Sequence, residues 1–548
     1  MTLPRLATLS YAAAGFGGLL AHDLARGVPS ALSFFPSRNW ETVAREIDVR
    51  KIPREKVCQI LKAGAERTNA PAAVLENIER LRQPGTYAIA TGQQAGLAGG
   101  PLFVIYKALT AIKLARTLEA GSGGRARFVP IFWVAGDDHD LAEIDHADFL
   151  APDHSLRRVH VKLDGENVGR SVCDVRLDAA QILELRKNLH EILGAEAPAD
   201  TIAAAYTGRS FSDAFAVLLN SWLGPLGIVV VQSSDVRVLG ADLLRRALSD
   251  YDVVSRLIQE DAASLERHGY KPGFGRQRPG PQFFVSTEPG GIRARLEPLP
   301  LDGGNFQESS QAFELRGLKP RTYSRKELEE LIAREPHRFS AAAALRPVLQ
   351  QSILPVVATI LGPGEIDYWA QLKRVHDHFG VPFPVVTPRA TLTLVDESTQ
   401  TNLRRLGIDA GAPELFAGED ALKKRVQSSG ELSRKIAQRT AAILAELDAL
   451  GTEVHAVDKG LKPLFDKAHE RFAHELARIA EKTSASLSQH EGAGLNRMKL
   501  ALDFIRPRTQ SQERVLTSAQ FIAKNPNLPN ELLEIIDPDL REHLIVAI

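Results

Sequence analysis

Five short apolar runs recur along the first 390 residues of the chain. They are rich in Val, Ile and Phe, and helical patterns separate most of them. A continuous apolar run, unlike an alternating one, is typical of a strand that is buried on both faces of a parallel sheet. The pattern therefore predicts an α/β fold with a doubly wound parallel sheet. The predicted strands are Tyr87–Thr91, Phe128–Gly136, Gly227–Ser233, Val356–Gly362 and Pro382–Thr387.

Three other segments interrupt this alternation. Residues 1 to about 85 have a mostly helical pattern, with a loop at Phe34-Phe35-Pro36. Residues of about 155–180 alternate apolar and polar positions around a turn, as a β-hairpin does. Residues of about 270–316 are rich in Gly and Pro and contain a second hairpin-like pattern. We expect both hairpins to be insertions into the parallel core.

The last third of the chain has a different period. Its apolar positions are spaced alternately by four and three residues, which is the seam of a coiled coil. Gly460 and Pro463 interrupt the seam, as expected where one helix ends and the next begins. We predict an antiparallel helical hairpin with arms near 420–457 and 463–487, followed by a third helix near 494–505. One kinked helix packed on the core is the alternative. The seam positions are Ile443, Leu447, Leu450, Val454, Val457, Leu461, Leu464 and Ala468.

Composition narrows the class of protein. With 548 residues and 44% hydrophobic content, the chain can bury a large core and form more than one domain. Its 67 basic and 67 acidic residues balance, so nothing global indicates nucleic acid or a membrane surface as a partner. The only cysteines, Cys58 and Cys173, exclude a disulfide framework and a four-cysteine zinc site. The apolar stretch 11–20 is too short to span a bilayer. We expect a cytoplasmic protein.

The first predicted strand leads into a polar, glycine-rich turn and then into an amphipathic helix, over Thr91–Ala115. A turn of this kind directs backbone N–H groups and a helix N-terminus towards an anion. Two adjacent glutamines in the turn are unusual, because Asn, Asp and Ser are the common turn formers. No P-loop motif is present, so the chain is not an ordinary P-loop ATPase. The candidate residues here are Thr91, Gly92, Gln93, Gln94, Gly96, Tyr106 and Lys107.

A second polar cluster, Asp137-Asp138-His139-Asp140, follows the second predicted strand. Ligands bind at the carboxyl ends of strands in open α/β sheets. Carboxylates beside a histidine can transfer protons or bind an ammonium group, and they are also metal-ligand types. The structural alternative is a helix N-cap with acidic residues near the helix dipole. That alternative explains one aspartate but not four consecutive polar residues.

A third cluster follows the fourth predicted strand. Gly362 and Gly364 would let the backbone approach a ligand closely, although Gly364 alone could be a turn residue. Glu365 and Tyr368 would occupy the first turns of the next helix, and Gln351 precedes the same strand. Arg389 follows the fifth strand, where it could bind a carboxylate or a phosphate, or form a surface salt bridge.

These three motifs, TGQQAGLAGGPLFVIYKALTAIKLA, FVPIFWVAGDDHDLAEIDH and LRPVLQQSILPVVATILGPGEIDYWAQLK, resemble the BshC family, the cysteine-adding enzymes of bacillithiol biosynthesis. The closing segment DFIRPRTQSQERVLTSAQFI is similar as well. The resemblance implies a Rossmann-like core with two insertions, arranged as in class I aminoacyl-tRNA synthetases, and a coiled coil that forms a homodimer. It implies a ligase that joins L-cysteine to glucosaminyl-malate through an amide bond, in the last step of bacillithiol biosynthesis. Family members are associated with adenine nucleotides. Where the family has the sequence FSPN, this chain has Phe339-Ser340-Ala341-Ala342.

We therefore expect a catalytic core at 1–418, with insertions near 151–215 and 265–320, a coiled coil at 419–510, and a tail at 511–548 that returns to the core. Gln94, Asp138, His139 and Asp140 are the predicted catalytic residues, and the other candidates bind substrate or nucleotide. We expect ATP or ADP with Mg²⁺, and no tightly bound metal. A metal-dependent hydrolase built on Asp137–Asp140 and a non-catalytic coiled-coil scaffold are the alternatives.

Overall fold

The structure is a computed structural model that describes residues 3–151, 155–194, 196–274, 279–299, 312–316, 321–420, 422 and 429–548. It divides into two compact units. The first contains Met1–Leu394 and Gln510–Val546, and the second contains Val395–Thr509 with Ala547–Ile548. Within the described ranges, no helix is both long and apolar enough to cross a membrane.

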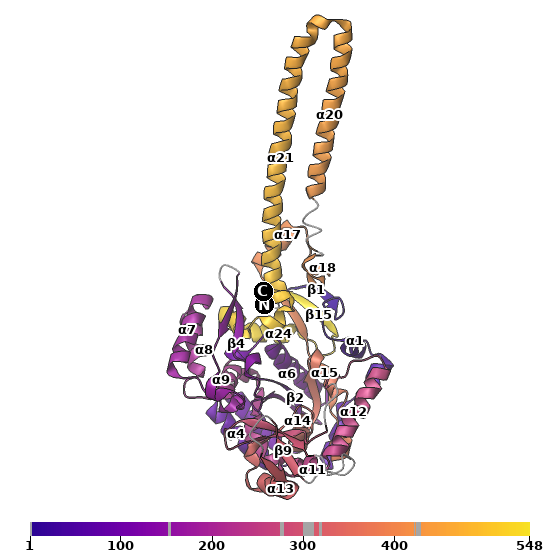
Figure 1. The fold of residues 1–548 in the computed structure, drawn as a ribbon. Helices are drawn as coiled ribbons and strands as arrows, with labels where there is room; N and C mark the ends of the chain where they lie inside the picture. The colour runs from indigo at the N-terminus through magenta and orange to yellow at the C-terminus, as the bar shows by residue number, and fades with distance from the viewer. Residues whose placement is uncertain are drawn as a thin grey trace. The chain divides into compact units, whose positions relative to one another are not determined.

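A parallel sheet of five strands forms the centre of the first unit (Figure 1), and it confirms the five strands predicted from the apolar runs. The strand order is β13-β12-β2-β3-β6, and every neighbouring pair is parallel. The chain therefore starts at β2 and adds β3 and β6 on one side. After a long crossover it adds β12 and β13 on the other side. This places a topological switch point between β2 and β12. The strands are β2 (Thr86–Gln93), β3 (Arg127–Val134), β6 (Val229–Gln232), β12 (Val356–Leu361) and β13 (Val385–Pro388).

Helices cover both faces of this sheet, as the continuous apolar runs require. Alternate residues of β2 face opposite layers: Tyr87 and Ile89 pack with α3 and α6, whereas Ala88 and Ala90 pack with α4 and α5. The doubly wound arrangement is thereby confirmed. The helices of these layers are α3 (Trp40–Asp48), α4 (Arg54–Arg67), α5 (Ala72–Arg82), α6 (Phe103–Gly121), α9 (Phe211–Leu223), α14 (Arg346–Ile353) and α15 (Pro363–Trp369).

The insertion between β6 and β12 forms a second, antiparallel sheet with the order β10-β9-β8-β7-β11. The predicted hairpin is confirmed as β7 and β8, which pair antiparallel. Parts of the predicted insertion, 275–278, 300–311 and 317–320, lie outside the described residues. The strands are β7 (Phe283–Ser286), β8 (Arg293–Pro298), β9 (Ala312–Leu315), β10 (Thr322–Ser324) and β11 (Phe339–Ala341), and the helices are α11 (Ala241–Ser249), α12 (Tyr251–Arg267) and α13 (Arg325–Arg334).

The first predicted insertion differs from expectation. β5 (Leu156–His160) pairs with the upstream strand β4 (His146–Leu150), not with a strand farther along the chain. Short 3-10 turns and α7 (Ala179–Leu193) follow instead. The prediction of a hairpin within 155–180 was wrong because an alternating pattern indicates a half-buried strand but not its partner.

The N-terminal segment also contains an unpredicted strand. β1 (Arg5–Ser10) pairs antiparallel with β15 (Glu542–Ala547), and β14 (Thr391–Val395) completes this three-stranded sheet. Helices α1 (Leu19–Ala25) and α2 (Pro29–Ser33) precede α3, so the rest of the segment is helical as expected. The expected loop at Phe34-Phe35-Pro36 is present.

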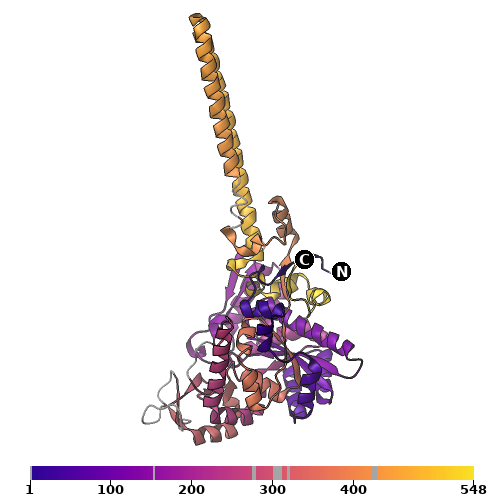
Figure 2. The ribbon, with the colours of Figure 1, turned by 90° about the vertical axis from the view of Figure 1, so that its right-hand side faces the viewer.

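The second unit contains a long helical hairpin formed by α20 (Ser429–Val457) and α21 (Lys462–Ile505). The two helices run side by side in Figure 1 and overlap in the view of Figure 2, and the turn between them lies at Lys459–Leu461. The predicted hairpin is confirmed, although residues 421 and 423–428 of the predicted first arm are not described. The prediction of a separate third helix was wrong, because α21 continues to Ile505. The remaining helices of the unit include α17 (Glu397–Arg405) and α18 (Glu414–Ala417).

Candidate active site

A cavity of about 420 Å³ opens at the carboxyl ends of the parallel strands. Gln94 follows β2, Asp138 follows β3, Ser233 follows β6 and Glu365 follows β12, and all four line it. Residues of β7, β8 and β11 from the antiparallel sheet line it as well. The cavity therefore lies at the topological switch point, where open α/β sheets bind ligands, and its size suits a small organic molecule.

Gln94 and Asp138 lie in direct contact in this cavity. The Gln94 amide donates to Asp138 Oδ2 at 2.5 Å and to Glu143 Oε2 at 2.6 Å. Asp138 Oδ1 accepts from the backbone N–H of His139 at 2.7 Å. Burial raises the pKa of Asp138, but these hydrogen bonds, together with the charge of Arg293, outweigh the effect of burial, so the net pKa is below the ordinary value. Asp138 is thus a carboxylate at neutral pH.

His139 contacts the antiparallel sheet. Arg293 Nη1 donates to His139 Nδ1 at 3.0 Å, and Arg293 Nε donates to the Ser340 hydroxyl at 2.8 Å. The Arg293 guanidinium also stacks on Phe284, 3.7 Å from its ring centroid. Burial, followed by the charge of Arg293, lowers the pKa of His139. His139 is therefore neutral at pH 7, and because Nδ1 accepts, its proton is on Nε2.

Lys107 connects the motif that follows β2 with the motif that follows β12. Its Nζ donates to Glu365 Oε2 at 2.5 Å, to the Gly92 carbonyl at 2.8 Å and to Gln93 Oε1 at 2.9 Å. Its side chain is 2% exposed, and burial lowers its pKa despite the neighbouring Glu365. With three acceptors, Lys107 aligns the ends of β2 and β12 and has no donor left for a ligand.

The four polar residues after β3 do not converge on one point. Asp137 forms a buried ion pair with Arg237, with Oδ1 at 2.5 Å from Nη2. Asp140 is exposed and does not line the cavity. Among the described residues, no group of three His, Cys, Asp or Glu side chains is arranged to hold a metal ion. This geometry gives the metal-dependent hydrolase no support.

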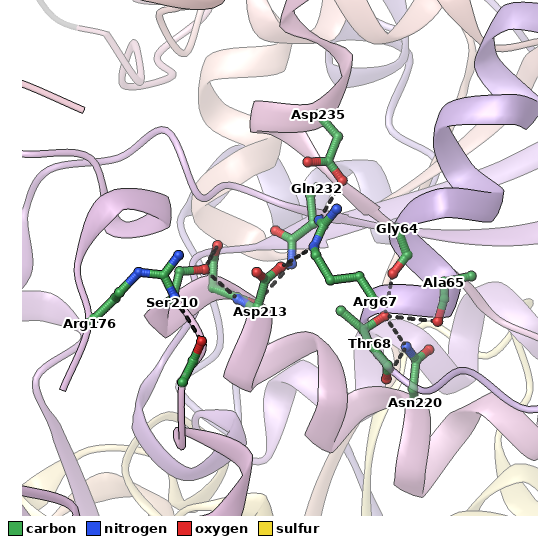
Figure 3. Close-up of polar contacts among 12 residues, drawn as sticks. Gly64, Ala65, Arg67, Thr68, Arg176, Ser210, Asp213, Asn220, Gln232 and Asp235 are labelled. Carbon is green, nitrogen blue, oxygen red and sulfur yellow. Dashed lines mark hydrogen bonds and ion pairs between the residues drawn. The ribbon is translucent and has the colours of Figure 1, made fainter. Parts of the chain in front are cut away.

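A polar network fixes the end of β6 beside the cavity (Figure 3). Arg67 of α4 lies between Asp213 of α9 and Asp235, with distances of 3.2 and 2.6 Å. The amide of Gln232, the last residue of β6, donates to the Ser212 carbonyl at 2.9 Å. The network ties α4, α9 and β6 to the short helix α10 (Ser233–Val236), so it positions that wall of the cavity.

The remaining predicted residues fall into two groups. Tyr368 lines the cavity and its hydroxyl lies 3.3 Å from Arg346 Nη2, and the Gly362 N–H donates to Glu365 at 2.7 Å. Six of the remaining residues do not line it: Gly362 and the five that follow. Thr91 and Gln351 bind backbone carbonyls, Tyr106 is fully buried, Gly96 packs against Gly100, and Gly364 has open space around it.

Arg389 is also absent from the cavity wall. It forms a buried ion pair with Glu513 of the C-terminal segment, with side-chain exposures of 2% and 0%. Arg389 Nη1 donates to the Ala390 carbonyl at 3.0 Å, and Glu513 Oε2 accepts from the Leu392 N–H at 3.3 Å. Neither a carboxylate-binding site nor a surface salt bridge describes this arginine. It fixes the returning C-terminal segment to the core.

Sequence reasoning missed several cavity residues, among them Arg293 and Phe284, and it gave Arg346 no site role. Arg293 and Phe284 belong to the inserted sheet, and Arg346 begins α14. Nothing in their local sequence shows that the inserted sheet lies over the strand ends. The one available signal was the basic and aromatic content of a hairpin that interrupts a parallel core.

Two family models together match almost the whole chain. Residues 18–390 match "Bacillithiol biosynthesis BshC, N-terminal Rossmann-like domain", and residues 392–548 match "Bacillithiol biosynthesis BshC, C-terminal coiled-coil domain". Relatives from Solibacter usitatus and Geobacillus thermodenitrificans, both named "Putative cysteine ligase BshC", are 28% and 31% identical. The alignments cover 94% of both chains in the first case and 92% of both in the second. Arginyl-tRNA synthetase of Thermus thermophilus aligns over 92% of this chain and 86% of its own at 10% identity, with a TM-score of 0.22, which is too low to bear on the fold.

Proposed function

The chain belongs to the BshC family of bacillithiol biosynthesis, and from this premise we propose that it is a ligase that joins L-cysteine to glucosaminyl-malate. The bond formed is an amide between the cysteine carboxyl and the amine of the sugar, in the last step of bacillithiol biosynthesis. The observation that carries the proposal is the cavity at the switch point, where the Asp138 carboxylate lies beside a neutral histidine. A non-catalytic scaffold does not need polar groups that converge in this way.

Asp138 is the group that we assign to the cysteine ammonium. Its lowered pKa keeps it ionised, which suits an ammonium ligand and makes it a weak base. Gln94 holds one of its oxygens in place at 2.5 Å. His139, with its proton on Nε2, serves as a hydrogen-bond donor in the cavity. The two residues therefore orient the amino acid.

Amide formation from a free carboxylate is unfavourable in water, so the cysteine carboxyl must be activated before the sugar amine attacks it. We propose that ATP, accompanied by Mg²⁺, supplies this activation: the carboxylate would attack a phosphorus atom of ATP and displace pyrophosphate or ADP, and AMP or phosphate would then leave the carbonyl carbon when the amine attacks. Its support is the position of the cavity, because sheets of this strand order bind nucleotides at the switch point. The chain's own residues orient cysteine and sugar so that the amine lies next to the activated carbon.

The test is product formation by the purified protein with cysteine, glucosaminyl-malate and ATP, followed by mass spectrometry. Omitting ATP should abolish the product. Asp138→Asn and Gln94→Ala should each lower kcat/KM by roughly 100-fold, because the first removes the charge that binds the cysteine ammonium and the second removes the donor that holds Asp138 in place. Asp140→Asn is the matched control, because that side chain is exposed and outside the cavity. If both cavity variants retained wild-type product formation, the assignment of the site would be wrong.

We also propose that the chain forms a homodimer through the α20–α21 hairpin. Several large apolar side chains of the hairpin are exposed, which an isolated coiled coil in water does not favour. Light scattering coupled to gel filtration should give the mass of a dimer. Leu450→Glu, at a position that is 51% exposed, should give a monomer with its fold intact. The exposed apolar residues are Ile443, Leu450, Val457, Leu461, Leu464, Phe472 and Ile479.

A further inference from the structure

The charged residues of the cavity are paired unevenly. Each of its carboxylates has a strong donor: Asp137 pairs with Arg237, Asp138 accepts from Gln94 and from backbone N–H groups, and Glu365 accepts from Lys107. Asp137 and Glu365 are therefore neutralised by cationic side chains of the protein, whereas the hydrogen-bond donors to Asp138 are uncharged and leave its negative charge for the cysteine ammonium.

The cavity's two arginines have only neutral partners. Arg293 donates to Ser340 and His139, and Arg346 donates to Gln350 Oε1 at 3.1 Å and to Tyr368 at 3.3 Å. No carboxylate of the described residues lies within salt-bridge distance of either guanidinium. Arg293 is 8% exposed, and burial lowers its pKa to about 10. The charges of Asp137 and Asp138 offset part of the cost of this burial from beyond salt-bridge distance, and an anionic ligand in direct contact would offset more of it.

The segment from Ser340 to Arg346 connects the surroundings of the two arginines. Ser340 holds Arg293, and Arg346 begins the helix that follows. The side chains of Ala341, Ala342 and Ala343 line the cavity in between and present no hydrogen-bonding atom. Two cationic side chains thus flank a wall whose methyl side chains make no hydrogen bond to them.

We propose that Arg293 and Arg346 bind a dicarboxylate, one carboxylate to each guanidinium. The fork of a guanidinium matches a carboxylate in a two-pronged hydrogen bond, which sets the orientation as well as the affinity. This inference rests on the proposed function in one respect: the dicarboxylate is then the malate part of glucosaminyl-malate. The malate would lie against the alanine wall, on the side of the cavity formed by the inserted sheet, while cysteine lies near Asp138.

Titration calorimetry with glucosaminyl-malate, and with L-malate and L-lactate as competitors, tests this inference without turnover. L-malate should compete and L-lactate, which has one carboxylate, should not. Arg346→Gln and Arg293→Gln should each raise the Kd for glucosaminyl-malate by roughly 30-fold or more. Arg334→Gln, which removes the same charge from an exposed site on α13, should leave the Kd unchanged. Arg346 is only half-buried, so its variant is testable even if Arg293→Gln does not fold.

Unchanged binding of glucosaminyl-malate in Arg346→Gln, or equal competition by malate and lactate, would overturn the inference. The inference would also be overturned if the arginine variants weakened the binding of ADP or inorganic phosphate and not that of malate. The two arginines would then form a phosphate site. The two proposals fail separately. Product formation with unaltered binding in the arginine variants refutes the dicarboxylate site alone. Arginine-dependent binding without product refutes the ligase alone.

Discussion

Replacing Glu513 by Gln tests whether Arg389 is structural or binds a ligand. Surface ion pairs contribute about 0–1 kcal/mol, whereas removing one partner of a buried pair costs about 3–5 kcal/mol. With exposures of 2% and 0%, this pair belongs to the buried class. Glu513→Gln keeps the size of the side chain but leaves the guanidinium buried without a counter-charge. We therefore expect the free energy of unfolding to fall by about 3–5 kcal/mol.

Urea denaturation followed by tryptophan fluorescence measures this loss of stability. The signal reports on the first compact unit, which contains the ion pair, because all four tryptophans belong to that unit. The double variant Arg389→Met with Glu513→Leu is the control. Replacing both charges with apolar groups should restore most of the lost stability, since no charge is then left unpaired. Glu513→Gln could instead lower the free energy of unfolding by less than about 1 kcal/mol and raise the KM for glucosaminyl-malate. That result would show that Arg389 binds the substrate and would refute its structural assignment.

Four further variants test the packing and the pH dependence of stability. Gly451→Ala places a Cβ 2.5 Å from an aromatic ring of α21 and should lower the melting temperature of the hairpin by circular dichroism, whereas Gly492→Ala, with nothing within 4 Å, should raise it; equal shifts would contradict the packing. Burial lowers the pKa of His376 to about 4 and of His543 to about 3. The unfolded chain takes up these protons first, so stability should fall between about pH 6.5 and pH 5, by roughly 2 kcal/mol per histidine. His543→Gln should remove about half of that dependence in urea titrations, and an unchanged slope would refute it. Gly92→Ala places a Cβ 2.5 Å from a carbonyl oxygen of β3 and should lower product formation at least tenfold, with wild-type rates as the contrary result.

The parallel core could be predicted because its signal is local. Each central strand, such as Val356–Leu361, is buried on both faces and is therefore a continuous apolar run. The strand Arg5–Ser10 carries no such signal, because its partner Glu542–Ala547 lies at the other end of the chain. The split of α21 near residue 490 was wrong for a related reason. A polar stretch with glycines resembles a helix end in sequence, but α21 continues through it.

The candidate site was predictable where it follows the strand ends and not where other segments cover them. Gln94 and Asp138 line the cavity because the carboxyl ends of β2 and β3 are neighbours. Arg293 was missed because it reaches the cavity from an inserted strand, and the docking of that strand is a tertiary event. Arg389 has the sequence position of a ligand-binding residue, yet its partner Glu513 comes from a segment more than a hundred residues away.

The most direct test of the central claim is thiol and metabolite analysis of host cells that lack this protein. The account predicts that glucosaminyl-malate accumulates and that its cysteine-containing product disappears. The wild-type gene should restore the product, and a copy carrying Asp138→Asn should not. Normal product levels in the deletion strain, or full restoration by Asp138→Asn, would contradict the proposed ligase.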